Sequence, residues 1–324
     1  MKILLTDIGD RVQLINCLKN SCTVIGADYM GRISPAAAFV DQFYSIPKFD
    51  DSNYINLLLD ICKSENIDFL IPLHEGKFYT LCENRQKFTS IGTTLLLSSE
   101  KIIDICQNKL KTYKFLGKNK ISSPKSYSKI EMLKLIENNH VDFPLIVKPI
   151  NGTGSVGVFK VYDINELNFF IKYIKEPIVQ EYVDGTEYTV DVLCDLHGFP
   201  ISIVPRERIE VKAGEVLKSR TVMHRQIIKE TYKLIKDLVE EVDSADNIRA
   251  VGPFTIQCKV TKDDEIKFIE INPRFGGGVP LTFKAGVDYG KYFNMMVRGQ
   301  EIEPVIGKFE EVTMLRYNEA IFIK

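Results

Sequence analysis

The sequence of 324 residues lacks several features that would place it in a specialised class of protein. No apolar run approaches the ~20 residues that a helix needs to cross a bilayer. The formal net charge is -1, so no bulk field favours nucleic acid or an anionic membrane as a partner. The apolar run within Met1–Asp7 is too short for a signal peptide and is interpreted as a first strand. We therefore expect a cytoplasmic protein without a nucleic-acid or membrane partner.

Cysteine and histidine are present but show no catalytic or metal-binding spacing. The chain has seven cysteines and four histidines, and no two cysteines form a Cys-x-x-Cys pair. Scattered cysteines of this kind suit reduced thiols. No Ser-His-Asp or Cys-His arrangement indicates a nucleophilic side chain. What remains is an ordinary globular composition, 45% hydrophobic and 26% charged, with length for about two or three domains.

The first 95 residues alternate short apolar strands with helical segments. The expected strands are Ile3–Thr6, Thr23–Ala27, Phe43–Ile46 and Phe69–Pro72. The segment Tyr54–Ser64 has apolar residues at helical spacing. This alternation is typical of an α/β unit with a mostly parallel sheet. Asp28 follows the second strand and either contacts a ribose or caps a turn, and its residue type favours the turn.

Residues 96–324 are expected to form a second domain of mixed α+β character. Ser98 and Ser99 are candidate N-caps for its first helix. A small lid is expected at about 117–180, and a C-terminal lobe with two long hairpins at about 181–324. The hairpin turns are predicted at Asp195–Gly198 and Thr261–Asp264, and Arg225–Val242 between them has the apolar stripe of an amphipathic helix.

The most informative segment is Ile266–Gly278, an apolar strand that leads into three glycines. Glu270, Asn272 and Arg274 are spaced two residues apart, so we expect them on one face of the strand. A carboxylate, an amide oxygen and a guanidinium together suit Mg²⁺ and a polyphosphate. The alternative is an ordinary strand end with solvated charges.

A glycine-rich loop follows the apolar strand Pro144–Pro149, which carries Lys148 near its end. Glycines let backbone N–H groups turn toward a bound anion. The loop leads into a second strand, Val158–Tyr162, and not into a helix, so it differs from a Rossmann fingerprint. It also lacks the Gly-Lys-Ser/Thr ending of a Walker loop. We interpret it as a flexible flap over phosphates, and the alternative is an ordinary glycine-rich hairpin.

A third segment, Ile178–Val192, is expected to form a strand, a turn at Asp184–Gly185 and another strand. The three segments in this order resemble the ATP-grasp superfamily, and most nearly a single ATP-grasp unit similar to the carbamoyl phosphate synthase large subunit. Ile25–Asp28 and Ile71–Gly76 look like strands of that family's leading domain. The resemblance covers most of the chain. It implies a pre-ATP-grasp α/β domain at 1–95 followed by a two-lobed ATP-grasp fold at 96–324.

The resemblance also implies roles for individual residues. Lys109 and Lys148 look like the two lysines that meet the α- and β-phosphates of ATP. Glu187 resembles the carboxylate that accepts from the ribose hydroxyls. Arg274 resembles the arginine beside the transferring phosphoryl group and, with Lys148, is the catalytic candidate. In the resemblance, the backbone of the hinge residues Glu181 and Val183 forms hydrogen bonds with adenine. The full implied ATP-binding set is Lys109, Lys148, Gly152, Gly154, Ser155, Gly157, Gln180, Glu181, Val183 and Glu187.

Gln257, Glu270 and Asn272 match the Mg²⁺ ligands of the family, and Mn²⁺ is the alternative metal. Gln257 supplies an oxygen without charge, at a position where many relatives have a carboxylate and synthase-like members have glutamine. Lys148 stands where the synthase usually has arginine. This departure, and the single ATP-grasp unit, distinguish the chain from carbamoyl phosphate synthase itself.

The candidate substrate residues are Arg206, Arg208, Lys218 and Glu75. In similar small ligases the segment with the two arginines borders the acylphosphate site, and a charged edge strand is the alternative. His74 and Glu75 end a first-domain strand and are candidates for contact with the second substrate. His224 is either a base or, as is more usual near a helix start, a surface residue.

The activity that the resemblance implies is an ATP-dependent ligase. It would activate a carboxylate as an acylphosphate and couple it to an amine, such as an amino acid, releasing ADP and phosphate. One alternative is a carbamoyl phosphate synthase-like kinase of carbamate or bicarbonate. Another is a nucleotide-binding protein without turnover. The expected partners are a small-molecule carboxylate and an amine, and a second copy of the chain is a candidate partner in a homodimer.

Overall fold

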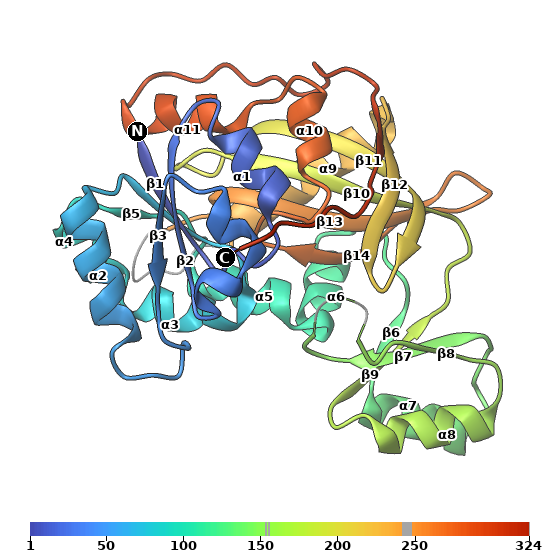
Figure 1. The fold of residues 1–324 in the computed structure, drawn as a ribbon. Helices are drawn as coiled ribbons and strands as arrows, with labels where there is room; N and C mark the ends of the chain where they lie inside the picture. The colour runs from blue at the N-terminus through green and yellow to red at the C-terminus, as the bar shows by residue number, and fades with distance from the viewer. Residues whose placement is uncertain (153, 155, 242–247, 324) are drawn as a thin grey trace.

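The computed structural model describes residues 1–152, 154, 156–241 and 248–323 of the chain. This part contains three β-sheets, with five, six and four strands. Figure 1 shows the five-stranded sheet near the N-terminus, the six-stranded sheet beside it, and the four-stranded sheet projecting below. This arrangement confirms the predicted mixed α/β fold class.

The N-terminal sheet is parallel, with strand order β3-β2-β1-β4-β5. Its strands are β1 (Lys2–Thr6), β2 (Thr23–Asp28), β3 (Gln42–Ser45), β4 (Phe69–Pro72) and β5 (Thr94–Leu95). The surrounding helices are α1 (Val12–Leu18), α2 (Tyr54–Glu65), α3 (Phe78–Glu83) and α4 (Arg85–Ser90), with 3-10 helices at Gly31–Ile33, Pro35–Ala38 and Glu75–Lys77. Ile3 and Leu5 pack into one core and Leu4 into another, as expected for a sheet covered on both faces. The four predicted strands and the helix after Tyr54 are confirmed, and β5 is an addition.

Asp28 ends β2 and caps a turn. Its Oδ2 accepts a hydrogen bond from the Gly9 N–H, and its Oδ1 accepts one from the Met30 N–H, both at 2.8 Å. The side chain is 2% exposed. Both oxygens are therefore engaged within the fold, which confirms the turn interpretation, and the loop after β1 is held against β2.

The six-stranded sheet is antiparallel and has the order β14-β13-β10-β11-β12-β15. Its strands are β10 (Thr186–Cys194), β11 (Pro200–Lys212), β12 (Glu215–Thr221), β13 (Gly252–Val260), β14 (Ile266–Asn272) and β15 (Thr313–Leu315). The helices α5 (Glu100–Gln107), α6 (Lys109–Lys118) and α9 (Arg225–Val239) pack against it through a shared core. The helices α10 (Pro280–Lys284) and α11 (Tyr289–Val297) lie on the side of the N-terminal sheet, where Phe293 contacts Phe69 edge to face.

The two predicted hairpins of this lobe are confirmed. β10 pairs with β11 across the turn at Asp195–Gly198, and β13 pairs with β14 across the turn at Thr261–Asp264. The amphipathic helix ends at Val239, three residues before the predicted end, and Val242 lies outside the described residues. Ser99 is the N-cap of α5, whereas Ser98 is buried and exchanges hydrogen bonds with the Val251 backbone.

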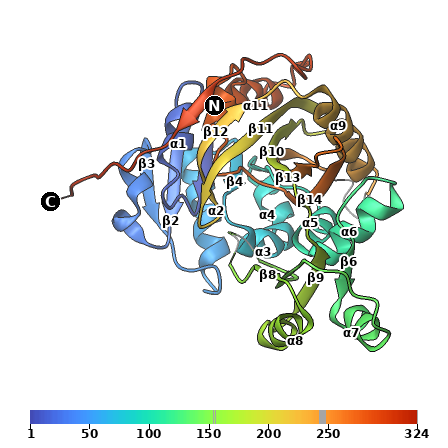
Figure 2. The ribbon, with the colours of Figure 1, turned by 90° about the vertical axis from the view of Figure 1, so that its right-hand side faces the viewer.

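The four-stranded sheet has the order β6-β9-β7-β8 and is antiparallel. Its strands are β6 (Ser126–Ser128), β7 (Leu145–Pro149), β8 (Phe159–Val161) and β9 (Pro177–Glu181), and α7 (Lys129–Glu137) and α8 (Ile164–Tyr173) complete the unit. Figure 2 shows both helices at the end that faces away from the six-stranded sheet. These elements form the predicted lid with a small core of their own. We keep the proposed domain boundary at residue 95, where β5 ends.

Two expectations from composition bear on the fold. None of the seven cysteines, all of which lie in the described ranges, forms a disulfide, and six of them are buried. Among the helices in the described ranges, none is both long enough and apolar enough to span a bilayer.

Candidate active site

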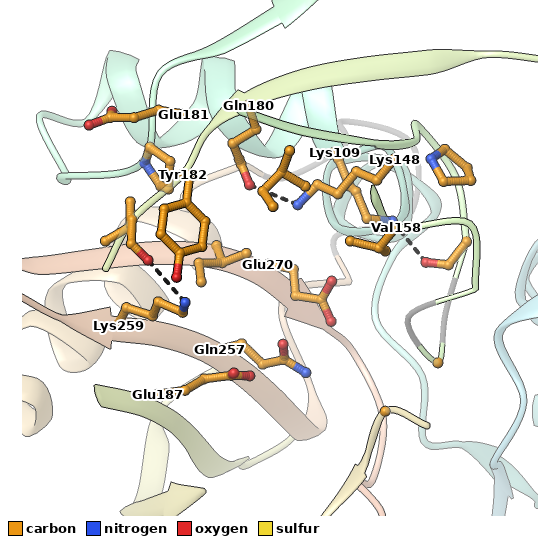
Figure 3. A pocket seen from close by; sticks show the side chains of 18 of the residues that line it. Lys109, Lys148, Val158, Gln180, Glu181, Tyr182, Glu187, Gln257, Lys259 and Glu270 are labelled. Carbon is orange, nitrogen blue, oxygen red and sulfur yellow. Dashed lines mark hydrogen bonds between the residues drawn. The ribbon is translucent and has the colours of Figure 1, made fainter. Parts of the chain in front are cut away.

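A cleft lies between the four-stranded lid sheet and the six-stranded sheet (Figure 3). It has about 950 Å³ of empty space, part of which is open solvent. Its walls include most of the residues predicted to bind ATP: Lys109, Lys148, Gly152, Gly154, Gln180, Glu181, Val183 and Glu187. Residues far apart in sequence therefore converge on one cleft.

Lys148 extends from β7 into this cleft. Its side chain is 5% exposed, and its Nζ donates to Gln180 Oε1 at 2.8 Å. Gln180 Nε2 in turn donates to Ser126 Oγ at 2.8 Å. Burial lowers the pKa of Lys148 to about 8, a shift that nearby Glu270 opposes and Lys109 reinforces. The cleft therefore holds a cationic group that no carboxylate of the described residues contacts directly.

The glycine-rich loop joins β7 to β8 as a hairpin connection, as predicted. Lys109, the first residue of α6, donates from Nζ to the Gly152 carbonyl at 2.8 Å. Gly157 has a φ of 72°, a conformation that non-glycine residues rarely adopt. Ser155 lies outside the described residues. The loop therefore lies next to both lysines, which is the position required of a flap over phosphates.

The segment after β9 connects the two sheets that form the cleft. β9 belongs to the lid sheet and β10 to the six-stranded sheet, so the turn at Asp184–Gly185 does not close a hairpin. Val183 accepts a hydrogen bond at its carbonyl from Lys259 Nζ at 3.0 Å, and its N–H has no partner among the described residues. The Glu181 carboxylate accepts from the Lys125 N–H at 3.1 Å. These positions fit the predicted hinge, in which backbone groups, and not side chains, contact the adenine of ATP.

Glu187 and Arg208 form an ion pair on the floor of the cleft. Arg208 Nη1 lies 2.8 Å from Glu187 Oε1, and Nη2 donates to the Gly214 carbonyl at 2.8 Å. The Arg208 side chain is 8% exposed. Arg208 thus joins the predicted ATP-binding residues rather than a separate substrate segment.

The three predicted metal ligands lie on the paired strands β13 and β14. Gln257 is opposite Glu270, and Asn272 is opposite Thr255. Asn272 Nδ2 donates to Glu270 Oε1 at 3.0 Å and to the Thr255 carbonyl at 3.3 Å, so the amide oxygen of Asn272 accepts from none of the described residues. A bulge in β14 between Phe268 and Glu270 shifts the register, and such bulges re-aim side chains.

The chemistry of this donor set fits Mg²⁺. It offers one carboxylate and two amide oxygens. No group of three histidine, cysteine, aspartate or glutamate side chains able to hold a metal is found in the described part of the chain. Mg²⁺ is commonly held by one or two carboxylates together with substrate phosphates. The residues therefore suit a metal that arrives with a nucleotide better than one bound by protein alone.

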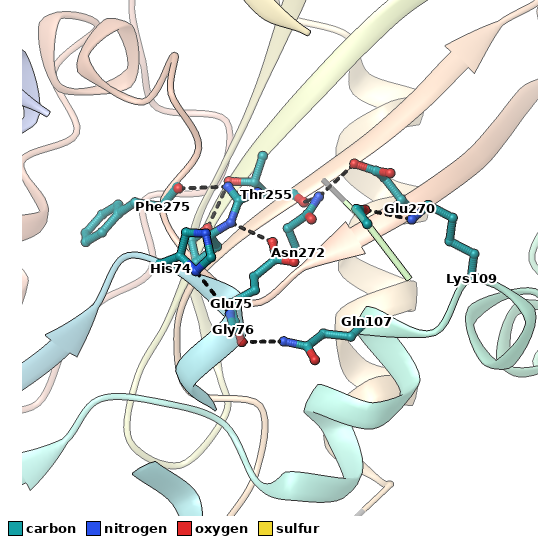
Figure 4. Close-up of polar contacts among 11 residues, drawn as sticks. His74, Glu75, Gly76, Gln107, Lys109, Thr255, Glu270, Asn272 and Phe275 are labelled. Atoms are coloured by element: carbon teal, nitrogen blue, oxygen red, sulfur yellow. Dashed lines mark hydrogen bonds and ion pairs between the residues drawn. The ribbon is translucent and has the colours of Figure 1, made fainter. Parts of the chain in front are cut away.

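Arg274 corrects one prediction from the sequence. β14 ends at Asn272, and Arg274 lies in the bend after it, so the three polar residues do not share one strand face. Figure 4 shows that this region meets the N-terminal domain. Arg274 Nε lies 2.6 Å from Glu75 Oε1, and Nη1 donates to the Phe275 carbonyl at 3.1 Å. The regular alternation of the strand therefore does not extend to Arg274.

Several other predicted substrate residues have partners elsewhere. Arg206 is buried, and its Nε and Nη2 bind Asp191 at 2.6 and 2.9 Å. Lys218 lies on the exposed β11–β12 hairpin, 2.6 Å from Glu210, and does not line the cleft. His74 and His224 accept hydrogen bonds at Nδ1 from Gly76 and Ile227 N–H groups. Both histidines therefore cap helices, and neither lines the cleft.

The sequence patterns did not identify some residues at the site. Tyr182 and Lys259 line the cleft, and Lys160 Nζ lies 3.4 Å from the centre of the Tyr182 ring. Arg11 and Arg316 approach the glycines after Arg274 from the two ends of the chain. Single side chains such as these carry no periodic signal, whether they lie in a strand, as Lys160 and Lys259 do, or in a loop. Only the folded arrangement therefore identifies them.

Comparison with known families agrees with this geometry. Residues 106–278 match the ATP-grasp domain family, and residues 3–96 match the PylC-like N-terminal domain family. The chain belongs to the ATP-grasp family. The residues that line the cleft described above all lie within the matched ATP-grasp region.

Relatives of this ATP-grasp protein include larger enzymes. It is 30% identical over 207 residues to the carbamoyl phosphate synthase large chain of Thermoanaerobacter sp., covering 60% of this chain and 18% of that protein. It is 28% identical over 273 residues to the multifunctional protein CAD of Squalus acanthias, covering 79% of this chain and 12% of that protein. The chain therefore spans less than a fifth of either relative.

Solved structures share the fold at low sequence identity. N5-carboxyaminoimidazole synthetase from Staphylococcus aureus complexed with ADP has a TM-score of 0.73 at 16% identity, covering 98% of this chain and 82% of that one. An L-amino acid ligase from Bacillus licheniformis has a TM-score of 0.66 at 18% identity, covering 94% and 77%. The three-sheet architecture is thus shared with these two solved structures.

Proposed function

We propose that this ATP-grasp protein is an ATP-dependent ligase that converts a carboxylate to an acylphosphate and couples it to an amine, with release of ADP and phosphate. The observation that carries the proposal is the composition of the cleft. Its described lining contains three lysines and one arginine, with Gln257 and Glu270 beside them, but no serine, cysteine or histidine. A phosphoryl group is therefore expected to pass directly between two bound substrates, without a covalent enzyme intermediate of those residue types.

The roles of the residues follow from their positions. Lys109 and Lys148 would neutralise the α- and β-phosphates, and the glycine loop would cover the triphosphate and exclude water. Gln257, Glu270 and Asn272 would hold Mg²⁺, which supplies charge stabilisation to the transferring phosphoryl group. Arg274 would orient the group through its planar fork. Positioning and electrostatics of this kind account for most of phosphoryl-transfer catalysis.

The products separate this proposal from its alternatives. With ATP, Mg²⁺ and a panel of carboxylates in the presence of hydroxylamine, we expect a hydroxamate, ADP and phosphate in equal amounts. Release of ADP that depends on an added carboxylate would exclude a nucleotide-binding protein without turnover. Stimulation by bicarbonate or carbamate alone would favour the synthase-like kinase. AMP and pyrophosphate as stoichiometric products would contradict the acylphosphate route.

A proton-linked signature of nucleotide binding is expected from Lys148. Because the pKa of Lys148 is about 8 in the protein without nucleotide, most Lys148 side chains are neutral at pH 8.5. The negative charge of bound phosphates should favour the protonated lysine. ATP binding at pH 8.5 should therefore take up a proton, and affinity should fall as the pH rises through 8. At pH 6.5 the lysine is already charged, and uptake should vanish.

Calorimetry in buffers with different ionisation enthalpies measures this uptake. Lys148→Arg is the matched control because arginine stays charged in this pH range, so it should bind ATP without proton uptake. Lys148→Ala should weaken ATP binding about ten- to a hundredfold, as expected for a lost charge-assisted contact. Equal uptake by the arginine variant would assign the proton to another group.

A further inference from the structure

Four arginines approach one short loop, Gly276–Gly278, from distant parts of the chain. Arg11 follows β1, Arg206 lies in β11, Arg274 follows β14, and Arg316 follows β15. A Cβ placed on Gly277 would lie 3.2 Å from Arg11 Nη1 and would collide with Glu215 Oε2, and one on Gly278 would collide with Arg206 Nη1. Arg316 Nη2 donates to the Gly277 carbonyl. None of these glycines has a positive φ. The missing side chains instead let Arg11 and Glu215 approach Gly277 and let Arg206 approach Gly278.

The charges in this arginine cluster are not fully balanced. Arg206 pairs with Asp191, Arg274 with Glu75, and Arg316 with Glu215. Arg11 has no hydrogen bond or ion pair with any described side chain. Burial, followed by the nearby charge of Arg274, lowers the pKa of Arg11, and the carboxylates of Glu215 and Asp10 oppose this shift. Among the described residues, this partly buried guanidinium therefore has carboxylates nearby but none in direct contact.

Several hydrogen-bond donors in the cluster also lack a partner. Arg206 Nη1 and Arg316 Nε are buried and bond to nothing in the described part of the chain; the Arg206 side chain is 1% exposed. The backbone N–H groups of the buried residues Gly276 and Gly278 likewise donate to no described acceptor. Buried donors are nearly always satisfied in folded proteins. Their concentration here is typical of a site for an anionic ligand.

The loop that carries Arg11 is held firmly in place. Lys77 forms an ion pair with Asp7, the residue after β1, and is only 3% exposed. Asp28 binds the Gly9 N–H in the same loop at 2.8 Å. The loop lies between β1 and β4, where the strand order reverses, and such switch points are common ligand sites in open parallel sheets. Arg11 is therefore presented by a rigid scaffold.

We propose that Arg11, Arg206 and Arg316, with the Gly276–Gly278 loop, bind a second anionic group, a carboxylate or a phosphoryl group, on the substrate that reacts with the activated carboxylate. The assignment to a substrate rests on the proposed ligase function. The cluster lies beyond the metal-binding strand β14, next to Arg274, and none of its arginines lines the nucleotide cleft. An amine with an acidic group, such as an amino acid or a phosphorylated amine, fits this arrangement.

The test measures anion binding by calorimetry with inorganic phosphate and with succinate as probes. The full chain is first saturated with Mg²⁺ and a non-hydrolysable ATP analogue, so that the nucleotide cleft is filled. We expect one anion to bind, and Arg11→Gln and Arg316→Gln each to weaken it at least tenfold, as for a lost charge-assisted contact. Exposed Arg298 supplies the control, since Arg298→Gln should bind as the wild type does. Affinity for the ATP analogue should be unchanged in all three variants.

The relative affinity of the two probes identifies which anionic group the arginine cluster binds. Tighter binding of phosphate indicates a phosphoryl group, and tighter binding of succinate indicates a carboxylate. The absence of anion binding, or equal binding by wild type and both cluster variants, overturns the proposal. If the protein does not bind nucleotide, the ATP analogue will not bind, and this result is distinct from the anion result. In that case the anion titration is carried out without nucleotide and still tests the arginines.

Discussion

Replacing Glu270 by glutamine is expected to lower kcat by about 10²- to 10³-fold, with folding unaffected, in line with losses on removing transition-state charge stabilisation. Glu270 is the one carboxylate among the three proposed metal ligands. Its neighbours Gln257 and Asn272 bring oxygens without charge, so the variant site would hold Mg²⁺ with amide oxygens alone. Glutamine keeps the shape and can still accept from Asn272 Nδ2, which lies 3.0 Å from the carboxylate in the wild type.

The measurement is ADP release at increasing Mg²⁺, with thermal unfolding to verify the fold. Activity should vanish with a chelator and return with Mg²⁺ or Mn²⁺ in the wild type. Gln257→Glu should shift the Mg²⁺ dependence to lower concentration, because it adds a negative ligand. Glu265, exposed on the same hairpin, is the matched control, and Glu265→Gln should be as active as the wild type. Metal-independent turnover would refute the assignment.

The sequence predicted most of the fold because its signals are local. Apolar strands such as Phe69–Pro72 and turns such as Asp195–Gly198 are defined by neighbouring residues, and the structure places each where the pattern predicts. Lys148, Gln257 and Glu270, which were selected from motifs that resemble a known family, all line the cleft. The cleft could thus be anticipated from short segments in the right order.

What the sequence did not predict depends on contacts between distant segments. The even spacing of Glu270, Asn272 and Arg274 suggested one face, but the strand ends at Asn272, so its alternation does not extend to Arg274. Glu75 and Arg274 are 199 positions apart, and the sequence gives no indication that they pair. Arg11 and Arg316 reach the same loop only because the N-terminal domain and the C-terminal segment both pack against it.

Arg274→Met is expected to lower kcat by roughly 10³-fold or more, the range for an arginine beside a transferring phosphoryl group. Two of its three guanidinium nitrogens are engaged by Glu75 and by the Phe275 carbonyl. Nη2 has no partner among the residues that the structure describes, and it remains to meet a substrate. Arg274→Lys keeps the charge but loses the fork, so kcat should fall much more than ATP affinity.

Glu75 acts in this scheme as a positioning residue, because it holds Arg274 Nε at 2.6 Å without lining the nucleotide cleft. Glu75→Gln should therefore lower kcat about tenfold, as expected for a lost contact to a charged group, and leave the KM for ATP unchanged. In an Arg274→Lys background the same change should have little further effect, since the geometry it supports is already lost. Additive losses across this double-mutant cycle would show that Glu75 works independently of Arg274. The cross-domain pair would then not be the link through which the N-terminal domain positions the reacting group.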